Sequence, residues 1–288
     1  MFPEGPLAVE SELRALFPWV AVVVGLAVGS FLNVVAYRLP RMLQAQWQAQ
    51  CAELEGRSVP AAPTYNLWVP RSQCPSCGRR LRALHNIPLI SYLALRGRCA
   101  FCEAAIPVRY PVVEAATALL FCWVAARFGW SAAGAGALVL TAFLLALALI
   151  DADTTLLPDD LTQPLLWLGL LLNLRATYAP LSEAVVGAAA GYLSLWSVYW
   201  LFKLATGKEG MGYGDFKLLA ALGAWLGWKM LLPIVLVSSL VGVLVGGTLH
   251  LLARRGREIP IPFGPYLAAA GFLVLLYGDR FAALIGFK

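Results

Sequence analysis

Residues 138–160 read LVLTAFLLALALIDADTTLLPDD, an almost wholly apolar run that ends in an aspartate. The stretch from Leu144 to Ile150 contains no polar residue, and Asp151 follows it directly. About 20 apolar residues cross the hydrocarbon core of a bilayer as a helix. A helix also satisfies its own backbone hydrogen bonds, which lipid cannot do. We therefore expect a transmembrane helix that carries an ionisable residue at its end.

The whole chain has the same apolar character. It has 288 residues, of which 60% are hydrophobic and only 13% charged, and its mean hydropathy is +0.73. A soluble domain is about half apolar and a quarter charged, so the composition argues against one. We predict an all-α polytopic membrane protein with about eight transmembrane helices and a zinc-binding cytoplasmic insert. The apolar segments are 17–37, 111–126, 134–150, 161–177, 184–202, 216–229, 230–252 and 262–285.

The basic residues predict how the chain is oriented. Ten arginines lie between the first two apolar segments, and lysine and arginine accumulate on the cytoplasmic side of membrane proteins. A nucleic-acid surface is the alternative, but the aromatic residues that stack on bases are sparse here, so we expect no nucleic-acid partner. A second arginine cluster then falls on the cytoplasmic side only if segment 216–229 crosses the membrane. The first cluster is Arg38, Arg41, Arg57, Arg71, Arg79, Arg80, Arg82, Arg96, Arg98 and Arg109, and the second is Arg254, Arg255 and Arg257.

Glycine pairs with G-x-x-x-G spacing occur in four of the apolar segments. Small residues at this spacing allow membrane helices to approach closely, so we expect these glycines to serve packing and not chemistry. The pairs are Gly25 with Gly29, Gly187 with Gly191, Gly223 with Gly227, and Gly242 with Gly246.

Four cysteines in the arginine-rich loop have metal-site spacing. Cys74 and Cys77 form one C-x-x-C pair, and Cys99 and Cys102 form a second. Two such pairs suit a structural zinc ion held by four thiolates, with no coordination position left for water. Two disulfides are the alternative, but a cytoplasmic loop is a reducing environment. The loop has too few apolar residues for a core, and a metal ion can supply the missing folding energy.

Two acidic residues lie at predicted cytoplasmic ends of spans. Asp151 ends the 134–150 segment, and Asp215 ends the sequence Gly212-Tyr-Gly214-Asp215 before the next one. Ionisable residues at membrane depth are functional candidates by default. When two carboxyl groups share a site one keeps its proton, so the pair can act as base and acid in amide hydrolysis. Asp153, Asp159 and Asp160 are expected instead to cap helices or face water.

These features together resemble the type IV prepilin leader peptidases that also N-methylate the pilin they cut. The resemblance rests on motifs throughout the chain. They are Gly29-Ser30-Phe31-Leu32-Asn33 with Tyr37-Arg38-Leu39-Pro40, both cysteine pairs, Asn86-Ile-Pro88, Arg109-Tyr-Pro111 with Glu114, Asp151 through Pro158-Asp159, and Gly212 through Asp215.

The resemblance implies a role for particular residues. Asp151 and Asp215 would be the catalytic aspartates, and Cys74, Cys77, Cys99 and Cys102 would bind zinc. The methyl donor would be S-adenosylmethionine, and the pair Gly97-Arg98 would take part in methyl transfer. The substrates would be type IV prepilins or type II secretion pseudopilins. The enzyme would cut them after a glycine, at the cytoplasmic face of the bacterial inner membrane.

We accordingly expect three parts in the chain. Residues 1–37 form a periplasmic N-terminus and the first transmembrane helix. Residues 38–110 form the methyltransferase-associated zinc-binding insert, and residues 111–288 form a transmembrane aspartic peptidase domain. Three alternatives are a peptidase without methyltransferase activity, a proton-coupled transporter whose two aspartates relay protons, and a zinc-ribbon membrane scaffold without chemistry.

Overall fold

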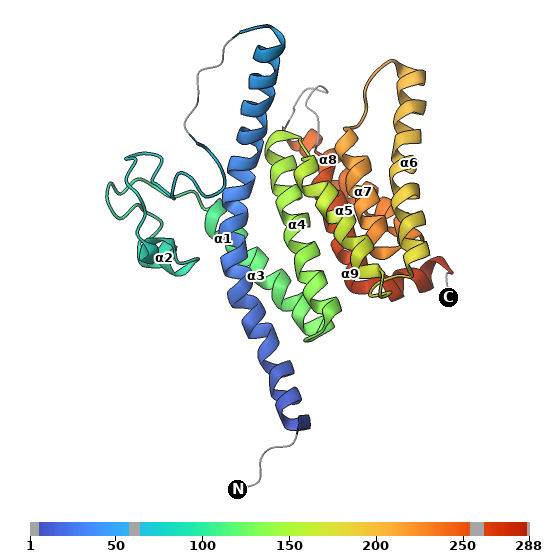
Figure 1. Cartoon of the computed structure of the whole chain (residues 1–288), viewed down its shortest axis with the longest axis horizontal. Coiled ribbons are helices and arrows are strands. Elements are labelled where there is room, and N and C mark those ends of the chain that lie inside the picture. The colour runs from blue at the N-terminus through green and yellow to red at the C-terminus, as the bar shows by residue number, and fades with distance from the viewer. Residues whose placement is uncertain (1–5, 58–63, 254–261, 287–288) are drawn as a thin grey trace. The chain divides into compact units, whose positions relative to one another are not determined.

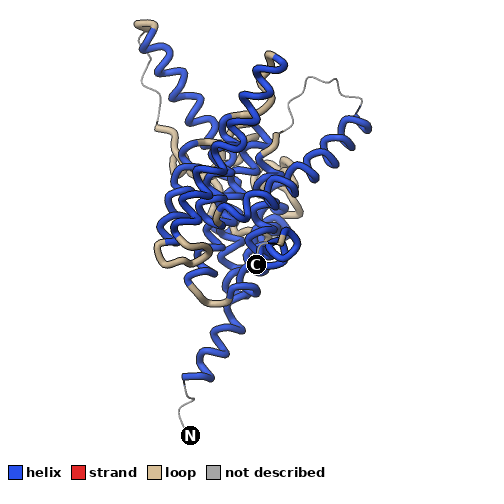
Figure 2. Tube along the Cα trace, turned by 90° about the vertical axis from the view of Figure 1, so that its right-hand side faces the viewer, coloured by secondary structure: helices blue, strands red, loops and turns tan. Residues whose placement is uncertain are grey.

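The computed structural model describes residues 6–57, 64–253 and 262–286, which contain helices and loops and, within those ranges, no β-strand (Figure 2). The chain forms two compact units, Met1–Trp130 and Ser131–Lys288. The helices of the first unit are α1 (Pro6–Leu54), η1 (Ala83–Asn86), α2 (Ile90–Ala94) and α3 (Arg109–Phe128). Those of the second are α4 (Ala132–Thr154), α5 (Asp159–Asn173), α6 (Leu181–Thr206), α7 (Tyr213–Leu226), η2 (Trp228–Met230), α8 (Leu231–Ala253) and α9 (Gly264–Ile285).

In the first unit, α1 and α3 lie side by side (Figure 1). The contact depends on two glycines of α1. A Cβ atom on Gly25 would lie 2.7 Å from the Cα of Ala118, and one on Gly29 would lie 2.8 Å from the Cα of Glu114. No larger residue permits this approach, so the expected packing role of this glycine pair is confirmed.

In the second unit, α7 packs against α5, α6 and α9. Ten of its fourteen residues are buried, from Asp215 to Trp225 with the exception of Lys217. Glycines again allow the contact with α6, because Gly187 and Gly223 meet backbone to backbone, and a Cβ on Gly191 would lie 2.7 Å from the carbonyl oxygen of Leu219. The helix that carries Asp215 is therefore held at the centre of its unit.

A described helix corresponds to each of the eight predicted apolar segments. Six of these helices are long and apolar enough to cross a membrane. The other two, α5 with 15 residues and α7 with 14, are shorter than the length of about 20 that spans a bilayer. The count of eight spans therefore stays a prediction. The arginine cluster that supported it, Arg254, Arg255 and Arg257, lies outside the described residues.

The first helix is longer than predicted. The sequence suggested a span at 17–37, but α1 continues without interruption to Leu54 and passes through Pro18 and Pro40. A helix satisfies its own backbone hydrogen bonds and can therefore continue from lipid into water. Hydropathy shows where the apolar part of such a helix ends, but not where the helix itself ends.

Candidate active site and metal centre

Asp151 lies in the last turn of α4 and is buried, with 4% of its surface exposed. The helix ends three residues later, and Thr155 adopts a left-handed conformation with φ of 54°. The Asp151 carboxyl group accepts a hydrogen bond from the backbone N–H of Gly264, the first residue of α9, with the nitrogen 2.8 Å from Oδ2. The end of one helix and the start of another therefore hold this carboxyl group.

Asp215 lies in the first turn of α7, and 7% of its surface is exposed. Gly212 caps this helix, and its carbonyl oxygen accepts the backbone N–H of Asp215 at 3.3 Å. The Asp151 and Asp215 carboxyl groups are both buried and lie within electrostatic range of each other, so the structure brings the two predicted catalytic residues into one site. The Oδ1 atom of Asp215 is buried and has no hydrogen-bond partner among the described residues.

Asp151 is buried, whereas the acidic residues near it in the sequence are exposed. Asp153, Asp159 and Asp160 are all exposed, as the sequence predicted. Asp159 has an additional role, because the ammonium group of Lys217 in α7 lies 2.6 and 2.8 Å from its two carboxylate oxygens. This ion pair links the start of α5 to the turn of α7 that follows Asp215.

Gly214, directly before Asp215 in the sequence, allows close packing. Glycines before a catalytic residue can let the backbone approach a substrate chain closely. A Cβ on Gly214 would instead lie 2.5 Å from the Cβ of Leu157, in the turn between α4 and α5. Gly214 therefore allows the two segments that carry the aspartates to meet.

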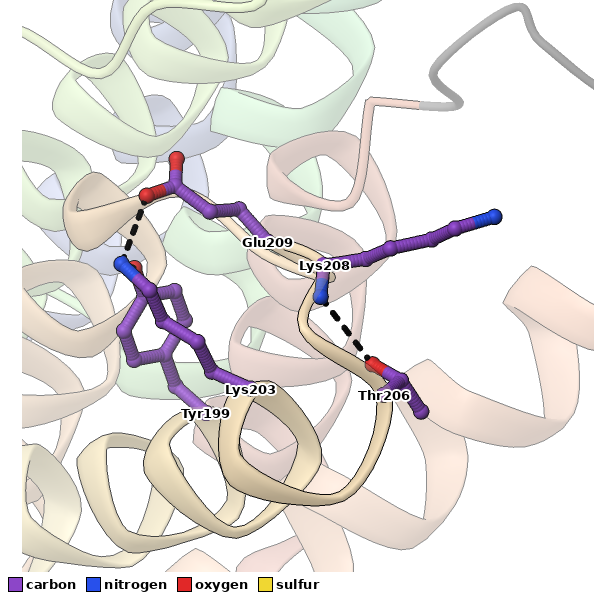
Figure 3. A network of polar contacts seen from close by, with 5 residues as sticks. All are labelled: Tyr199, Lys203, Thr206, Lys208 and Glu209. Atoms are coloured by element: carbon purple, nitrogen blue, oxygen red, sulfur yellow. Dashed lines mark hydrogen bonds and ion pairs between the residues drawn. The ribbon is translucent and has the colours of Figure 1, made fainter.

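The loop that leads into α7 is tied back to α6 (Figure 3). The ammonium group of Lys203 lies 2.8 Å from Oε1 of Glu209 and donates a hydrogen bond to the hydroxyl of Tyr199. The hydrogen bond from Lys203 lowers the pKa of Glu209. The Tyr199 ring also packs against Tyr213 and Phe216, on either side of Asp215 in the sequence. These contacts restrict the position of the Asp215 turn.

The four predicted cysteine ligands lie together. All are free thiols, and their sulfur atoms lie within 4.8 Å of one another. The Sγ atoms of Cys74 and Cys102 are 3.8 Å apart. A zinc ion with bonds of about 2.3 Å to four sulfurs would separate each pair by about 3.8 Å, so the cluster fits a tetrahedral metal site.

The backbone forms a similar knuckle at each cysteine pair. Cys74 donates an N–H to the carbonyl oxygen of Arg79, and Cys99 donates one to that of Ala104. The fourth residue after each first cysteine, Gly78 or Glu103, has a positive φ angle. Such tight turns direct backbone N–H groups toward the sulfurs.

The neighbouring groups shift the pKa values of Cys74 and Cys102 in opposite directions. Hydrogen bonds from the backbone N–H groups of Cys77 and Ser76 lower the pKa of Cys74 to about 6. The N–H of Ala104 lowers the pKa of Cys102, but desolvation and the neighbouring sulfurs together raise it to about 12. Four sulfurs this close cannot all be ionised without a cation between them, so the full set of thiolates requires a metal.

Buried polar residues anchor the insert to the two long helices of its unit. The carboxylate of Glu114 in α3 accepts the backbone N–H of Leu89, at 2.8 Å. Arg38 in α1 donates to the carbonyl oxygens of Asn66 and Leu67. Asn33 donates to the carbonyl oxygen of Tyr110. Three of the sequence motifs therefore have a structural explanation.

Gly97 and Arg98 lie beside the second knuckle. Gly97 has a φ of +70°, and a Cβ there would lie 2.9 Å from the hydroxyl of Tyr92, so only glycine fits. Arg98 lines a surface depression of about 600 Å³. Pockets for small ligands have volumes of about 300 to 1,000 Å³. The depression is lined by Ala94, Leu95, Arg96, Arg98, Cys99, Ala100 and Glu103.

Sequence reasoning missed Gly264, which binds Asp151, and Lys217, which pairs with Asp159 beside the site. Lys217 was hidden because its partner Asp159 is 58 residues away. Gly264 was missed because it lies 113 residues from Asp151. The sequence Phe263-Gly264-Pro265 did contain a local signal, since proline in the first turn marks a helix start, where N–H groups are free to bind an anion.

Two family models match the chain. The Bacterial Peptidase A24 N-terminal domain matches residues 23–128, and the Type IV leader peptidase family matches residues 138–247. The two matches cover most of each compact unit. The first holds the cysteine cluster, and the second holds both aspartates.

Several curated proteins named prepilin leader peptidase/N-methyltransferase are similar over nearly their whole length. The protein of Stutzerimonas stutzeri is 55% identical over 264 residues, 91% of either chain. That of Pseudomonas aeruginosa is 55% identical over 272 residues, 93% of this chain and 94% of its own. That of Aeromonas hydrophila is 54% identical over 95% of this chain and 96% of its own. No solved structure matches the chain significantly. The chain belongs to the type IV leader peptidase family.

Proposed function

We propose that this chain is a membrane aspartic endopeptidase that cleaves the leader peptide from type IV prepilins and N-methylates the new N-terminus. One observation carries the proposal. Asp151 and Asp215 form a buried carboxyl pair in a chain that matches prepilin leader peptidase/N-methyltransferases over nine-tenths of its length. The transporter, the scaffold and the peptidase-only readings are not favoured by these relatives.

The carboxyl pair can hydrolyse a peptide bond without a metal ion. The ionised carboxylate takes a proton from water, and the water oxygen attacks the carbonyl carbon of the scissile bond. The protonated carboxyl group gives its proton to the carbonyl oxygen, so that a tetrahedral diol forms. The carboxyl group that took the water proton then gives it to the leaving nitrogen as the carbon–nitrogen bond breaks, and the other carboxyl group regains a proton from the diol. One water is consumed, and the two carboxyl groups still share one proton.

Zinc is the metal that best suits the insert. Four thiolates fill a tetrahedral coordination sphere, so Cys74, Cys77, Cys99 and Cys102 would hold the ion for a structural purpose. The separation of 3.8 Å between two of the sulfurs supports this reading. The bound ion would fix the two knuckles and, with them, the position of Gly97 and Arg98.

We place the methyl donor in the open depression beside the second knuckle, where an arginine can bind its carboxylate. S-adenosylmethionine supplies an electrophilic methyl group and carries a carboxylate. Arg98 would hold that carboxylate in a charge-assisted pair. The N-terminal amine, exposed by cleavage, would lose a proton as the new carbon–nitrogen bond forms. We assign the insert, residues 38–110, to this second reaction and residues 111–288 to the first.

We propose the substrates and the cellular location from the relatives and from the charge pattern. The relatives are bacterial, and the concentration of arginine in the insert supports an active site on the cytoplasmic side of the inner membrane. Type II secretion pseudopilins are a second substrate class that we propose beside the type IV prepilins. The apolar first helix of a pilin would lie in the bilayer beside the enzyme.

The proposed function is tested with purified enzyme and a prepilin, with and without S-adenosylmethionine. Mass spectrometry should show loss of the leader in both samples and one added methyl group only in the sample that contains the donor. An intact prepilin under both conditions, from a folded enzyme in detergent or lipid, would contradict the function.

Arg98→Ala should separate the two activities. We expect prepilin cleavage to stay within about twofold of wild type, because the carboxyl pair lies in the other unit. We expect methylation to fall by about tenfold or more, the effect of losing one charge-assisted contact. Gly97→Val should have the same selectivity, since its left-handed backbone and Tyr92 leave no room for a side chain.

Arg71→Ala is the matched control, because this insert arginine does not line the depression. It should methylate like wild type. If Arg98→Ala and Gly97→Val both methylate at the wild-type rate, the methyl-transfer site lies elsewhere.

A further inference from the structure

The N-terminus of α9 lies against one of the two carboxyl groups. The backbone nitrogen of Gly264 is 2.8 Å from Oδ2 of Asp151, and the hydrogen bond is buried. A Cβ atom on Gly264 would lie only 2.7 Å from the same oxygen. The close approach therefore depends on the absence of a side chain at this position.

The two carboxyl groups differ in how their oxygens are satisfied. The Asp151 carboxyl group accepts the backbone N–H of Gly264, and both carboxyl groups lie at a helix N-terminus, so the helix dipole does not by itself distinguish them. Asp215, however, has an enclosed oxygen, Oδ1, without a donor among the described residues. A buried ionised oxygen without a partner is costly, whereas a protonated one can donate to a ligand.

We propose that Gly264 is a positioning residue for leader cleavage, which holds Asp151 as the ionised base while Asp215 carries the proton at Oδ1. This inference rests on the proposed peptidase function. In the hydrolysis above, Asp151 takes the proton from water. Asp215 gives the Oδ1 proton to the carbonyl oxygen of the scissile bond. Afterwards the proton taken up by Asp151 passes to the leaving nitrogen, and Asp215 regains its own from the diol.

The first test compares two glycine variants of α9. In Gly264→Ala, the new methyl group displaces the Asp151 carboxyl group, so kcat for prepilin cleavage should fall by about 100-fold, the effect of a misplacement of about 1 Å. The KM for prepilin should stay within about twofold, because Gly264 acts on the carboxyl group and not on the substrate helix. Gly278→Ala is the control, since its Cβ would find only the sulfur of Met230, at 3.8 Å.

The outcomes of this test separate three causes. Wild-type enzyme must cleave, and its failure would count against the proposed function instead. A wild-type kcat for Gly264→Ala would overturn the positioning role. An equal loss of cleavage in Gly278→Ala would show that α9 is merely sensitive to any substitution, which also overturns it. Methylation of an already cleaved pilin should be unchanged in both variants.

The second test detects which carboxyl group is protonated, and it does not depend on whether Gly264→Ala folds. Infrared difference spectra should contain the carbonyl stretch of a protonated carboxylic acid in the wild-type enzyme at neutral pH. The band should disappear in Asp215→Asn and remain in Asp151→Asn. Disappearance in Asp151→Asn alone would reverse the assignment of base and acid.

Discussion

Asp151→Asn and Asp215→Asn should each abolish leader cleavage while the protein still inserts into the membrane. Asparagine has nearly the same shape as aspartate, but it can neither act as a base nor share a proton. Both aspartates are buried in one site, and removing one member of a catalytic unit costs on the order of 10⁴-fold in kcat. The rate of prepilin cleavage in detergent measures the effect.

Asp160→Asn is the matched control for this pair. Asp160 lies nine residues after Asp151 but is exposed to solvent, so the same chemical change there should leave cleavage near the wild-type rate. Substantial cleavage by either Asp151→Asn or Asp215→Asn would exclude the carboxyl pair as the source of the activity.

Cys99→Ser should release the metal and loosen the insert. The wild-type protein should contain about one zinc ion per chain by elemental analysis, as a four-thiolate site requires. A structural zinc ion contributes about 10–16 kcal/mol to the folding of zinc-finger peptides, so the loss of one ligand is expected to unfold the knuckles. The insert should then be cut by protease at concentrations that leave the wild type intact. Cys74→Ser should have the same effect.

Cys51→Ser controls for the loss of a thiol, because Cys51 is exposed on α1 and lies outside the cluster. It should keep both the metal and the protease resistance. A wild-type protein without metal, whose cluster cysteines do not react with thiol reagents, would point to disulfides. It would also point to an insert on the opposite side of the membrane.

The sequence predicted the helical elements, whereas the count of eight spans stays a prediction. Hydropathy located a helix at every apolar segment because burial in lipid depends only on local composition. It did not reveal that α7 is enclosed by α5, α6 and α9, since a buried helix and a lipid-facing helix are equally apolar. The glycine pairs pointed to close packing but not to which helices meet.

Some residues of the candidate site are predicted from the sequence, and others are recognised only from the structure. Each C-x-x-C pair is a local pattern, so the sequence predicts the four cysteines as one metal cluster. Asp151 and Asp215 stood out because charge is rare at the ends of apolar runs. Gly264 carries no charge, and its contribution is a backbone N–H placed by the tertiary fold. Lys217 and Asp159 likewise form an ion pair that only the packing of α5 against α7 brings about.

We expect one chain to perform two reactions at two separate sites. The most direct measurement supplies Asp215→Asn enzyme with two substrates, an intact prepilin and a pilin already freed of its leader, together with S-adenosylmethionine. We predict that the variant leaves the prepilin uncut but adds one methyl group to the mature pilin at close to the wild-type rate. Failure to methylate the mature pilin, by a variant that retains its metal and a protease-resistant insert, would contradict the account.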